Sequence, residues 1–245
     1  MKHLLHKGST AAAALLLAAT AAQAQVSFGP RVGLNATTLN YDFKDDDEPD
    51  SKTALGAQVG LSLNAQFGKL SVQPSLLFTM KGDKAEDSGR ETFGGSDPVT
   101  IVYDVKQTIR LNYIELPVNL VYSTNGAEGG FQVFAGPYVA LGLGGKVKSE
   151  SKVTITANGQ TETESESESN NIKFASEEGD DDKLYLRALD AGFNLGMGYK
   201  VGGAQVQLGY GLGLGNLIPK DQDGKDPEGK VRNRGFQLSF AYFFN

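Results

Sequence analysis

Cysteine and tryptophan are absent from this sequence, and histidine occurs only at His3 and His6. The absence of cysteine excludes disulfide bonds and a lipid anchor attached to an N-terminal cysteine. Enzymes that cleave acyl chains or peptides generally use histidine as a base, because its pKa suits proton transfer near neutral pH. Both histidines lie in a segment with the features of a signal peptide, and no pair of carboxylates stands out as a substitute. We therefore expect no enzymatic activity, no catalytic or metal-binding residues and no cofactor.

The N-terminal segment, residues 1–24, has the composition of a signal peptide. Two lysines precede the apolar stretch Ala11–Ala22, and Ala22-Gln23-Ala24 fits the small-x-small rule for cleavage. The alternative, a retained anchor helix, needs about 18 or more apolar residues, and this stretch is too short. We expect cleavage after Ala24 and a single domain over residues 25–245.

Basic residues are outnumbered in this chain. Its 23 lysines and arginines face 29 aspartates and glutamates, a net charge of −6, and the predicted cleavage removes two of the lysines. An acidic chain of this kind does not provide the basic stripe that nucleic acid requires, so we expect no nucleic-acid partner. Long apolar runs are also lacking after residue 24, and no transmembrane helix is predicted there.

Period-two alternation is the main pattern that the mature chain does contain, and it is clearest over residues 54–67. The odd positions are all apolar, and the even positions are all polar or glycine. Because side chains of a strand alternate between its faces, this strand has one apolar and one polar face. The 31 glycines lie mostly within such segments. They suit the inward positions of a narrow closed barrel, where little space is available.

The alternation recurs in eight segments joined by short and long connections in turn. The predicted strands are residues 26–38, 54–67, 70–81, 99–122, 131–147, 186–200, 204–217 and 232–244. The predicted long loops are residues 41–53, 82–98, 148–182 and 218–231. This pattern predicts an all-β fold, an eight-stranded antiparallel transmembrane β-barrel (an up-and-down meander) with long extracellular loops and short periplasmic turns. Both termini are then periplasmic, and we expect the cell outer membrane as its location, outer-membrane lipid as its surroundings and no additional periplasmic domain.

A soluble lipocalin-like barrel is the alternative for eight strands. Its apolar face would surround a ligand and its charged face would meet water. Here the polar faces of the strands consist mainly of glycine, serine, asparagine and glutamine, and the charges lie in the loops. This distribution favours a packed polar lumen inside a membrane barrel.

The strand predicted over residues 99–122 changes phase. Its apolar positions are odd from Val99 to Val105 and even from Ile114 to Tyr122. A one-residue change of this kind predicts a β-bulge in this strand. We expect its first half to extend beyond the membrane.

The third long loop, Lys148–Asp182, is the longest connection and the predicted site of a possible protein partner. Val153 and Ile155 before Asn158-Gly159 predict a hairpin that extends the preceding strand. Residues 161–171 have almost no apolar side chains, and we expect them to form a mobile acidic tip. A solvated tip without a partner is the alternative.

Aromatic residues recur at the predicted periplasmic strand ends, in outward register. They predict an aromatic girdle at the membrane interface, consisting of Phe28, Phe67, Tyr122, Phe131, Tyr199 and Phe244.

Polar and charged side chains fall in inward register at several strands. The predicted lumen network consists of Arg31, Glu115, Asp190, Asn35, Asn119 and Asn194. Since buried charges must be paired or hydrated, we expect Arg31 to pair with Glu115 across the lumen. The network is interpreted as structural, and a gate in a narrow channel is the alternative.

Three acidic segments could offer oxygen ligands to calcium. Asp221–Glu228 resembles part of a calcium loop but lacks the full twelve-residue pattern. Asp45–Glu48 and Asp180–Asp182 match less well. We interpret all three as solvated loop charge, and therefore predict no metal site.

Five segments of the chain resemble the PorT-like outer-membrane β-barrel family of Gram-negative bacteria. They are residues 29–35, 112–117, 136–138, 190–196 and 234–239. The resemblance covers essentially the whole mature chain and implies a small cell-envelope barrel. Our own interpretation of the chain is a structural role or the binding of a partner through the outer loops or rim. The resemblance also implies a possible link to protein secretion, because the namesake is linked to the type IX system. The alternative function is a narrow channel for ions or small polar solutes.

Overall fold

Ten strands and one short 3₁₀ helix make up the described parts of the computed structural model, which are residues 25–43, 51–95, 97–179 and 184–244. Eight strands form a closed antiparallel ring in the order β4-β3-β2-β1-β10-β9-β8-β5, and β5 closes the ring by pairing with β4. The ring strands are β1 (Gln25–Asp42), β2 (Ser51–Phe67), β3 (Leu70–Phe93), β4 (Val99–Ser123), β5 (Gly129–Ala157), β8 (Leu189–Val201), β9 (Ala204–Gly213) and β10 (Lys230–Tyr242). The predicted eight-stranded barrel is confirmed.

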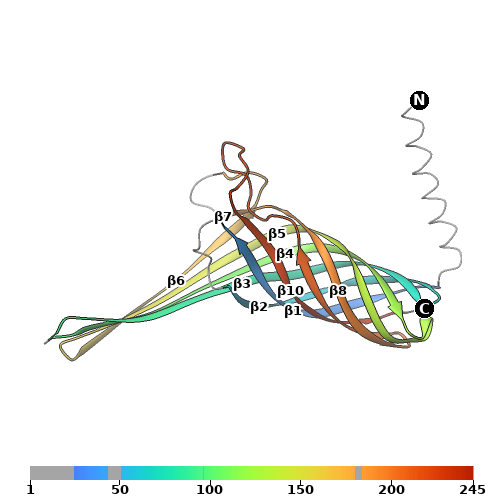
Figure 1. Ribbon diagram of the computed structural model, residues 1–245, viewed down its shortest axis with the longest axis horizontal. Coiled ribbons are helices and arrows are strands. Elements are labelled where there is room, and N and C mark those ends of the chain that lie inside the picture. The colour runs from blue at the N-terminus through green and yellow to red at the C-terminus, as the bar shows by residue number, and fades with distance from the viewer. Residues whose placement is uncertain (1–24, 44–50, 96, 180–183, 245) are drawn as a thin grey trace.

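Short turns lie at one end of the barrel and long connections at the other (Figure 1). The short connections are residues 68–69, 202–203 and a turn that contains η1 (Gly126–Glu128). The predicted signal peptide lies outside the described residues. Within the described residues, no helix is long and apolar enough to cross a membrane.

A four-stranded sheet extends from the long-loop end, well past the rest of the barrel (Figure 1). It consists of the outer parts of β3, β4 and β5 together with β6 (Gln160–Phe174), the strand that returns from the β5 hairpin. We call this element, residues 82–93, 99–110, 146–157 and 160–171, the projecting sheet. The short β7 (Leu184–Leu186) pairs with the end of β6.

The predicted division of each barrel strand into two faces is confirmed. Leu61 and Leu195 are 62% and 46% exposed, whereas their neighbours Ser62 and Asn194 are 1% and 4% exposed. The same alternation continues around the ring, so the outer surface is aliphatic and aromatic and the inner surface is polar. Side chains that are exposed on such a ring are those available to contact lipid.

Glycine on one strand makes room for an aromatic ring on the next inside the barrel. A Cβ atom added at Gly196 would lie 2.6 Å from the ring of Phe134, and one added at Gly209 would lie 2.9 Å from it. Phe134 is itself buried, at 6% exposure. The inward glycines therefore allow a large side chain to fill a narrow lumen, which agrees with the role predicted for them.

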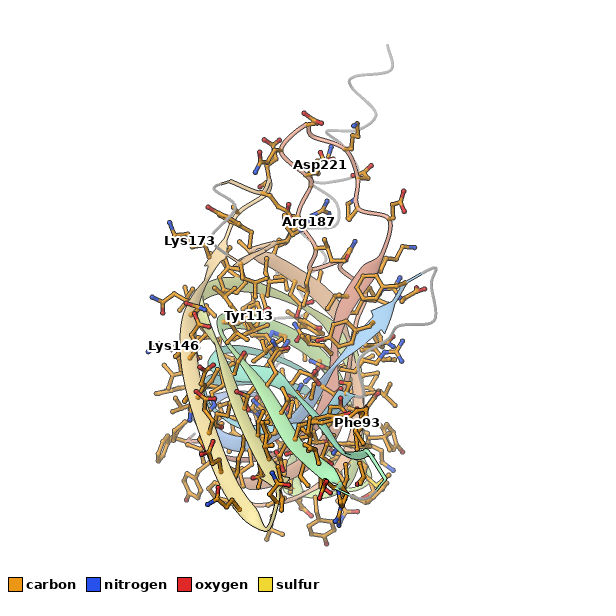
Figure 2. All side chains as sticks on the ribbon, turned by 90° about the vertical axis from the view of Figure 1, so that its left-hand side faces the viewer. Phe93, Tyr113, Lys146, Lys173, Arg187 and Asp221 are labelled. Carbon is orange, nitrogen blue, oxygen red and sulfur yellow. The ribbon has the colours of Figure 1, made fainter. Side chains whose placement is uncertain are left out.

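An apolar cap closes the long-loop end of the barrel. Leu217, which follows β9, is fully buried against Leu39 and Val231. A second buried cluster contains Leu111, Tyr113 and Tyr138 from the barrel wall and Ile172 from β6, with Leu186 of β7 packed against both clusters. Figure 2, which views this end, places Tyr113 within the mouth of the ring. Residue 217 is thus part of the cap and not of the strand predicted over 204–217.

The phase change in β4 has a different origin from the predicted one. β3 and β4 pair without interruption from Leu77–Glu115 to Phe93–Val99, so the alternation of β4 is regular there. The register shift occurs between β4 and β5, where Asn112 pairs with Gly144 and Tyr113 with Gly142, and the extra residue is Leu143 of β5. The apolar side of β4 changes because its outward side chains meet lipid in the barrel but water in the projecting sheet.

Two predicted loops are largely strand. β3 continues to Phe93, so most of the loop predicted over 82–98 is paired with β4. Residues 161–171, predicted to be a mobile tip, lie in β6 and pair with β5 from Gln160 to Ile172. Both segments lack an apolar face because both of their faces meet water, and the backbone of the neighbouring strand supplies their hydrogen bonds. The predicted hairpin at Asn158-Gly159 is confirmed, and both residues have positive φ, 51° and 73°.

Candidate functional site

Three buried charges meet in the upper part of the lumen. The Lys81 ammonium lies 2.8 Å from a carboxylate oxygen of Glu115 and 3.1 Å from one of Asp190. The three side chains come from β3, β4 and β8, so the contacts join strands that are not all neighbours in the ring. Asn233 donates to Asp190 at 2.9 Å, and the Tyr138 hydroxyl donates to the same carboxylate at 3.3 Å. Lys81 therefore cross-links three walls of the barrel.

The predicted lumen residues are all buried, but they do not form the predicted pair. Glu115 forms an ion pair with Lys81, while Arg31 donates from Nη2 to Ser239 at 2.8 Å. Asn35 donates to Thr79 and to the Met80 carbonyl. Asn119 and Asn194 lie near Arg31 around a small cavity and not in the charge cluster. The expected network thus consists of two groups at different levels.

Sequence reasoning missed Lys81 because it stood at the end of a predicted strand, where a lysine is ordinarily solvated. The sequence did contain one indication that Lys81 points inward: its position has the same parity as Ser75 and Thr79, which face the lumen on the same strand. Among the described residues, the six buried charges are three cations and three anions, namely Arg31, Lys81, Lys200, Asp83, Glu115 and Asp190. Since an uncompensated buried charge is costly, this formal balance lowers the cost of the polar interior, although Arg31 Nε and Nη1 have no hydrogen-bond partner among the described residues.

A chain of side-chain amides fills the lower part of the lumen. Gln205 donates to Gln132 at 2.7 Å, and Gln132 donates to Ser123 at 2.8 Å. On the other side, Gln73 donates to Asn64 at 2.9 Å. All five side chains are buried. These bonds join the walls of the barrel at a second level below the charge cluster.

The lumen contains little free volume between these layers. Two cavities beside Arg31 and beside Lys81 have volumes of about 10 Å³ each. A cavity of this size holds about one water molecule. A larger cavity of about 150 Å³ lies at the short-turn end, next to Gln66 and Lys200.

One face of the projecting sheet is acidic. Cross-strand pairing places Glu164 beside Val153, Val153 beside Tyr103, and the neighbouring rows repeat the pattern. The face has an apolar centre, Ile101, Tyr103, Val105, Val153 and Ile155, and acidic edges, Glu162, Glu164, Glu166, Glu168, Asp87 and Glu91. No lysine or arginine of these four segments points to this side. We call this surface the acidic face; it continues the inner side of the barrel wall.

The opposite face of the projecting sheet is basic, and it continues the outer side of the barrel wall. Its cations are Lys84, Arg90, Lys106, Arg110, Lys146, Lys148 and Lys152, and its anions are Glu86, Asp104 and Glu150. The anions have partners: Glu150 lies 2.7 Å from the Lys148 ammonium and Glu86 lies 3.1 Å from that of Lys52. A hydrogen bond from Lys148, together with its charge, lowers the pKa of Glu150. We call this surface the basic face.

The six aromatic residues predicted as a girdle lie near the short-turn end of the barrel. Phe28 and Phe244 form a bridge, with ring centroids 6.4 Å apart, and Phe131 pairs with Tyr199. Five of the six are between 42% and 61% exposed, and Phe67 is half-buried. Tyr242, which sequence reasoning did not include, contacts Phe244 edge-to-face, with ring centroids 5.1 Å apart.

The acidic loop Asp221–Glu228 uses its carboxylates internally. The Asp221 side chain accepts backbone hydrogen bonds from Asp223 and Lys225, and Asp226 lies 3.9 Å from the Lys220 ammonium. No group of three or more potential metal ligands is found among the described residues. Asp45–Glu48 and Asp180–Asp182 lie outside the described residues.

Comparison with known proteins relates this chain to outer-membrane barrels. Among solved structures, it is similar to Ail, the attachment invasion locus protein of Yersinia pestis, with 13% identity, a TM-score of 0.36, and coverage of 90% of this chain and 99% of that one. Neisserial surface protein A shows 12% identity, a TM-score of 0.33, and coverage of 90% and 99%. No curated protein matches the sequence.

The family model for the outer membrane protein beta-barrel domain matches residues 21–219. The match spans most of the chain and includes the first seven strands of the ring in full. The family is one of outer-membrane proteins and is not an enzyme family, in agreement with the expected location and with the expectation of no enzymatic activity. The chain belongs to the outer membrane protein beta-barrel domain family.

Proposed function

We propose that this protein is a binding protein of the outer membrane, which holds a protein partner outside the cell on the acidic face of the projecting sheet. The observation that carries the proposal is the unneutralised charge of this face. Glu162, Glu164 and Glu166 have no ion pair with any described residue, although the opposite face carries an excess of cations. An acidic rim around an apolar centre complements a partner surface with basic and apolar residues.

The orientation follows from the two ends of the barrel. Short turns are typical of the periplasmic side of such barrels, and long loops are typical of the outside. The six aromatic residues near the short turns then form the girdle at the periplasmic interface with lipid. The projecting sheet and the cap stand at the opposite, extracellular end, where a partner has access to them.

The packing of the lumen argues against the alternative function as a narrow channel. The apolar cap, the charge cluster and the amide layer lie in series along the axis, and the cavities beside Arg31 and Lys81 hold about 10 Å³ each. An aqueous pathway would require all three layers to open.

Trimming the projecting sheet tests the proposed function. Ala85, Gln107, Ser149 and Glu168 form one row across the sheet, so both of its hairpins can be cut at this level. In the trimmed variant, Asn-Gly replaces residues 86–106, and a second Asn-Gly replaces residues 150–167. The new turns copy the native Asn158-Gly159 turn, and the cap residues remain.

The trimmed variant should assemble and keep its heat-dependent shift on gels, because the closed ring is intact. Surface crosslinking on intact cells should lose the partner that the full-length protein captures. A second variant, with Gln in place of the four β6 glutamates and the projecting sheet at full length, should also capture less of the partner. Unchanged crosslinks in the trimmed variant would exclude the projecting sheet as the binding element.

A finer assignment to the PorT-like branch, with its link to protein secretion, is also a proposal. It is supported by the five sequence segments that resemble that branch. Deletion of the gene should then reduce the amount of secreted protein in culture supernatants, and restoration by the trimmed variant would separate this role from partner binding at the sheet.

A further inference from the structure

A cluster of cations lies on the outer wall of the molecule, just above its lipid-facing belt. It consists of the side chains of Lys84, Arg110, Lys146, Lys148 and Lys173, which come from β3, β4, β5 and β6. We call these five residues the basic patch. Figure 2 shows Lys146 and Lys173 pointing away from the barrel on the same side.

Strand pairing brings these side chains together. Arg110 pairs with Lys146, and in the next row Lys84 pairs with Thr108, which pairs with Lys148. Side chains directly opposite in a sheet lie about 5 Å apart, and the next row on the same face follows after about 7 Å. Like charges at these distances repel each other, so the arrangement is unfavourable unless anions occupy the space between them.

The patch has little neutralisation within the protein. Only Lys148 forms an ion pair with a described residue, Glu150, at 2.7 Å. Arg110, Lys146 and Lys173 are exposed, and Lys84 is half-buried. Beside the patch, Lys52 of β2 pairs with Lys84 and has its own counter-charge, Glu86, at 3.1 Å. Higher on the basic face, Asp104 lies 3.8 Å from Lys106.

The height of the patch matches the level of lipid headgroups. On β4, Arg110 precedes the lipid-facing Ile114 by four residues, which is about 13 Å along a strand. On β5, Lys146 follows Leu143, which is 55% exposed on the same wall. A headgroup layer extends roughly 5–8 Å beyond the hydrocarbon on each side, and long basic side chains bend toward such a layer. The strands are tilted, so the vertical distance is shorter than the distance along the chain.

We propose that the basic patch binds the phosphate groups of anionic lipids in the outer leaflet. Arg110 and Lys146 form its centre, and Lys84, Lys148 and Lys173 surround it. The contact fixes the rotation and tilt of the projecting sheet above the membrane surface. This inference does not depend on the proposed partner, because the patch lies on the face opposite the acidic one.

Lipid occupancy measured on the full-length protein tests the proposal. The protein is placed in phosphatidylcholine nanodiscs that contain diphosphoryl lipid A, and the bound lipid is counted by native mass spectrometry after release. The test variant carries Lys84→Gln, Arg110→Gln, Lys146→Gln and Lys173→Gln. The control carries the same change in charge higher on the sheet and on a loop, as Arg90→Gln, Lys106→Gln, Lys152→Gln and Lys225→Gln.

The patch variant should lose about a hundredfold or more in affinity for diphosphoryl lipid A, read from its occupancy at several lipid fractions, since each of the four lost cations contributes roughly a factor of five. The control should retain the occupancy of the unmodified protein. Lipid A without phosphate should bind equally weakly to all three proteins. If the variant with four substitutions fails to fold, the double variant Arg110→Gln with Lys146→Gln should still bind less diphosphoryl lipid A than the unmodified protein.

Equal occupancy in the patch variant and the unmodified protein would overturn the proposal. An equal loss in the control would also overturn it, because the attraction would then depend on total charge and not on this patch. Retained binding of lipid A without phosphate would show that phosphate is not the group recognised. Complete displacement of the lipid by the same concentration of inorganic phosphate would show that the patch binds free phosphate and has no preference for lipid.

Discussion

The lumen of the barrel and the projecting sheet use charged residues in opposite ways, although β3, β4 and β5 run through both. In the lumen, Lys81 is 6% exposed and contacts two carboxylates. In the projecting sheet, all the cations lie on one face and the β6 glutamates on the other, and none of the four β6 glutamates has an ion pair with a described residue. Burial makes an unpaired charge costly, while water tolerates it. Charge therefore holds the barrel walls together at one end of these strands and remains available for external ligands at the other.

Among the substitutions that test this comparison, removal of Lys81 should have the largest effect on the stability of the barrel. Lys81→Met leaves Glu115 and Asp190 buried without their counter-charge, which typically costs about 3–5 kcal/mol. We expect a strongly reduced urea midpoint, or loss of the heat-modifiable folded form. The triple variant with Glu115→Gln and Asp190→Asn should regain much of this loss. A single variant as stable as the unmodified protein would show that the cluster does not hold the walls together.

Arginine at two exposed apolar positions should distinguish lipid from water. Leu61 is 62% exposed on the barrel and Ile155 is 44% exposed on the projecting sheet. Leu61→Arg should cost roughly 2–4 kcal/mol if the residue lies near the middle of the membrane. Ile155→Arg should cost little, because its surroundings are aqueous. Urea unfolding in lipid vesicles measures both, and equal losses would contradict the assigned membrane boundary.

Packing inside the barrel should be sensitive to a single methyl group. Gly196→Ala brings a Cβ atom within 2.6 Å of the Phe134 ring, whereas a Cβ atom at Gly144 has no neighbour within 4 Å. We expect Gly196→Ala to lower stability by about 1–3 kcal/mol, as is typical of overpacking. Gly144→Ala is the matched control at the base of the projecting sheet and should be neutral or slightly stabilising. A neutral result at both positions would show that the lumen is loosely packed.

Loss of a surface ion pair should have the smallest effect. Lys148 and Glu150 are about half exposed, and their contact of 2.7 Å lies on the basic face. Lys148→Met should leave the urea midpoint unchanged within error, in contrast to Lys81→Met, because exposed pairs contribute little. A large shift would mean that the projecting sheet is stabilised by its charges and would weaken the distinction between the two regions.

Several features of the projecting sheet could not be predicted from apolar alternation alone. β6 alternates glutamate with serine or threonine and has almost no apolar residue, and this composition by itself predicts a mobile tip. The alternation itself, with period two, was a signal of a strand with two different polar faces. The outer part of β3, residues 83–93, has no such regular alternation, because its odd positions mix acidic, small and apolar residues. Both become strands because the neighbouring strands, β5 and β4, provide hydrogen-bond partners along their whole length.

The charge cluster shows a different limit of sequence reasoning. The inward register of Arg31, Glu115 and Asp190 could be predicted strand by strand. The choice of partner could not, because Lys81 reaches both carboxylates only when the ring is closed. The apolar cap is similar, since Leu217 is buried by residues from β1 and β10 that are distant in the sequence.

The sequence by itself determined the number of barrel strands, their two faces and the end that carries the long connections. The physical reason is local: each barrel residue meets either lipid or the lumen, and this choice alternates along the chain. The tertiary structure decided which loop residues extend into strands, which charges meet across the lumen and how the mouth is closed. Those features depend on contacts between distant strands, and the alternation of a single strand contains no information about them.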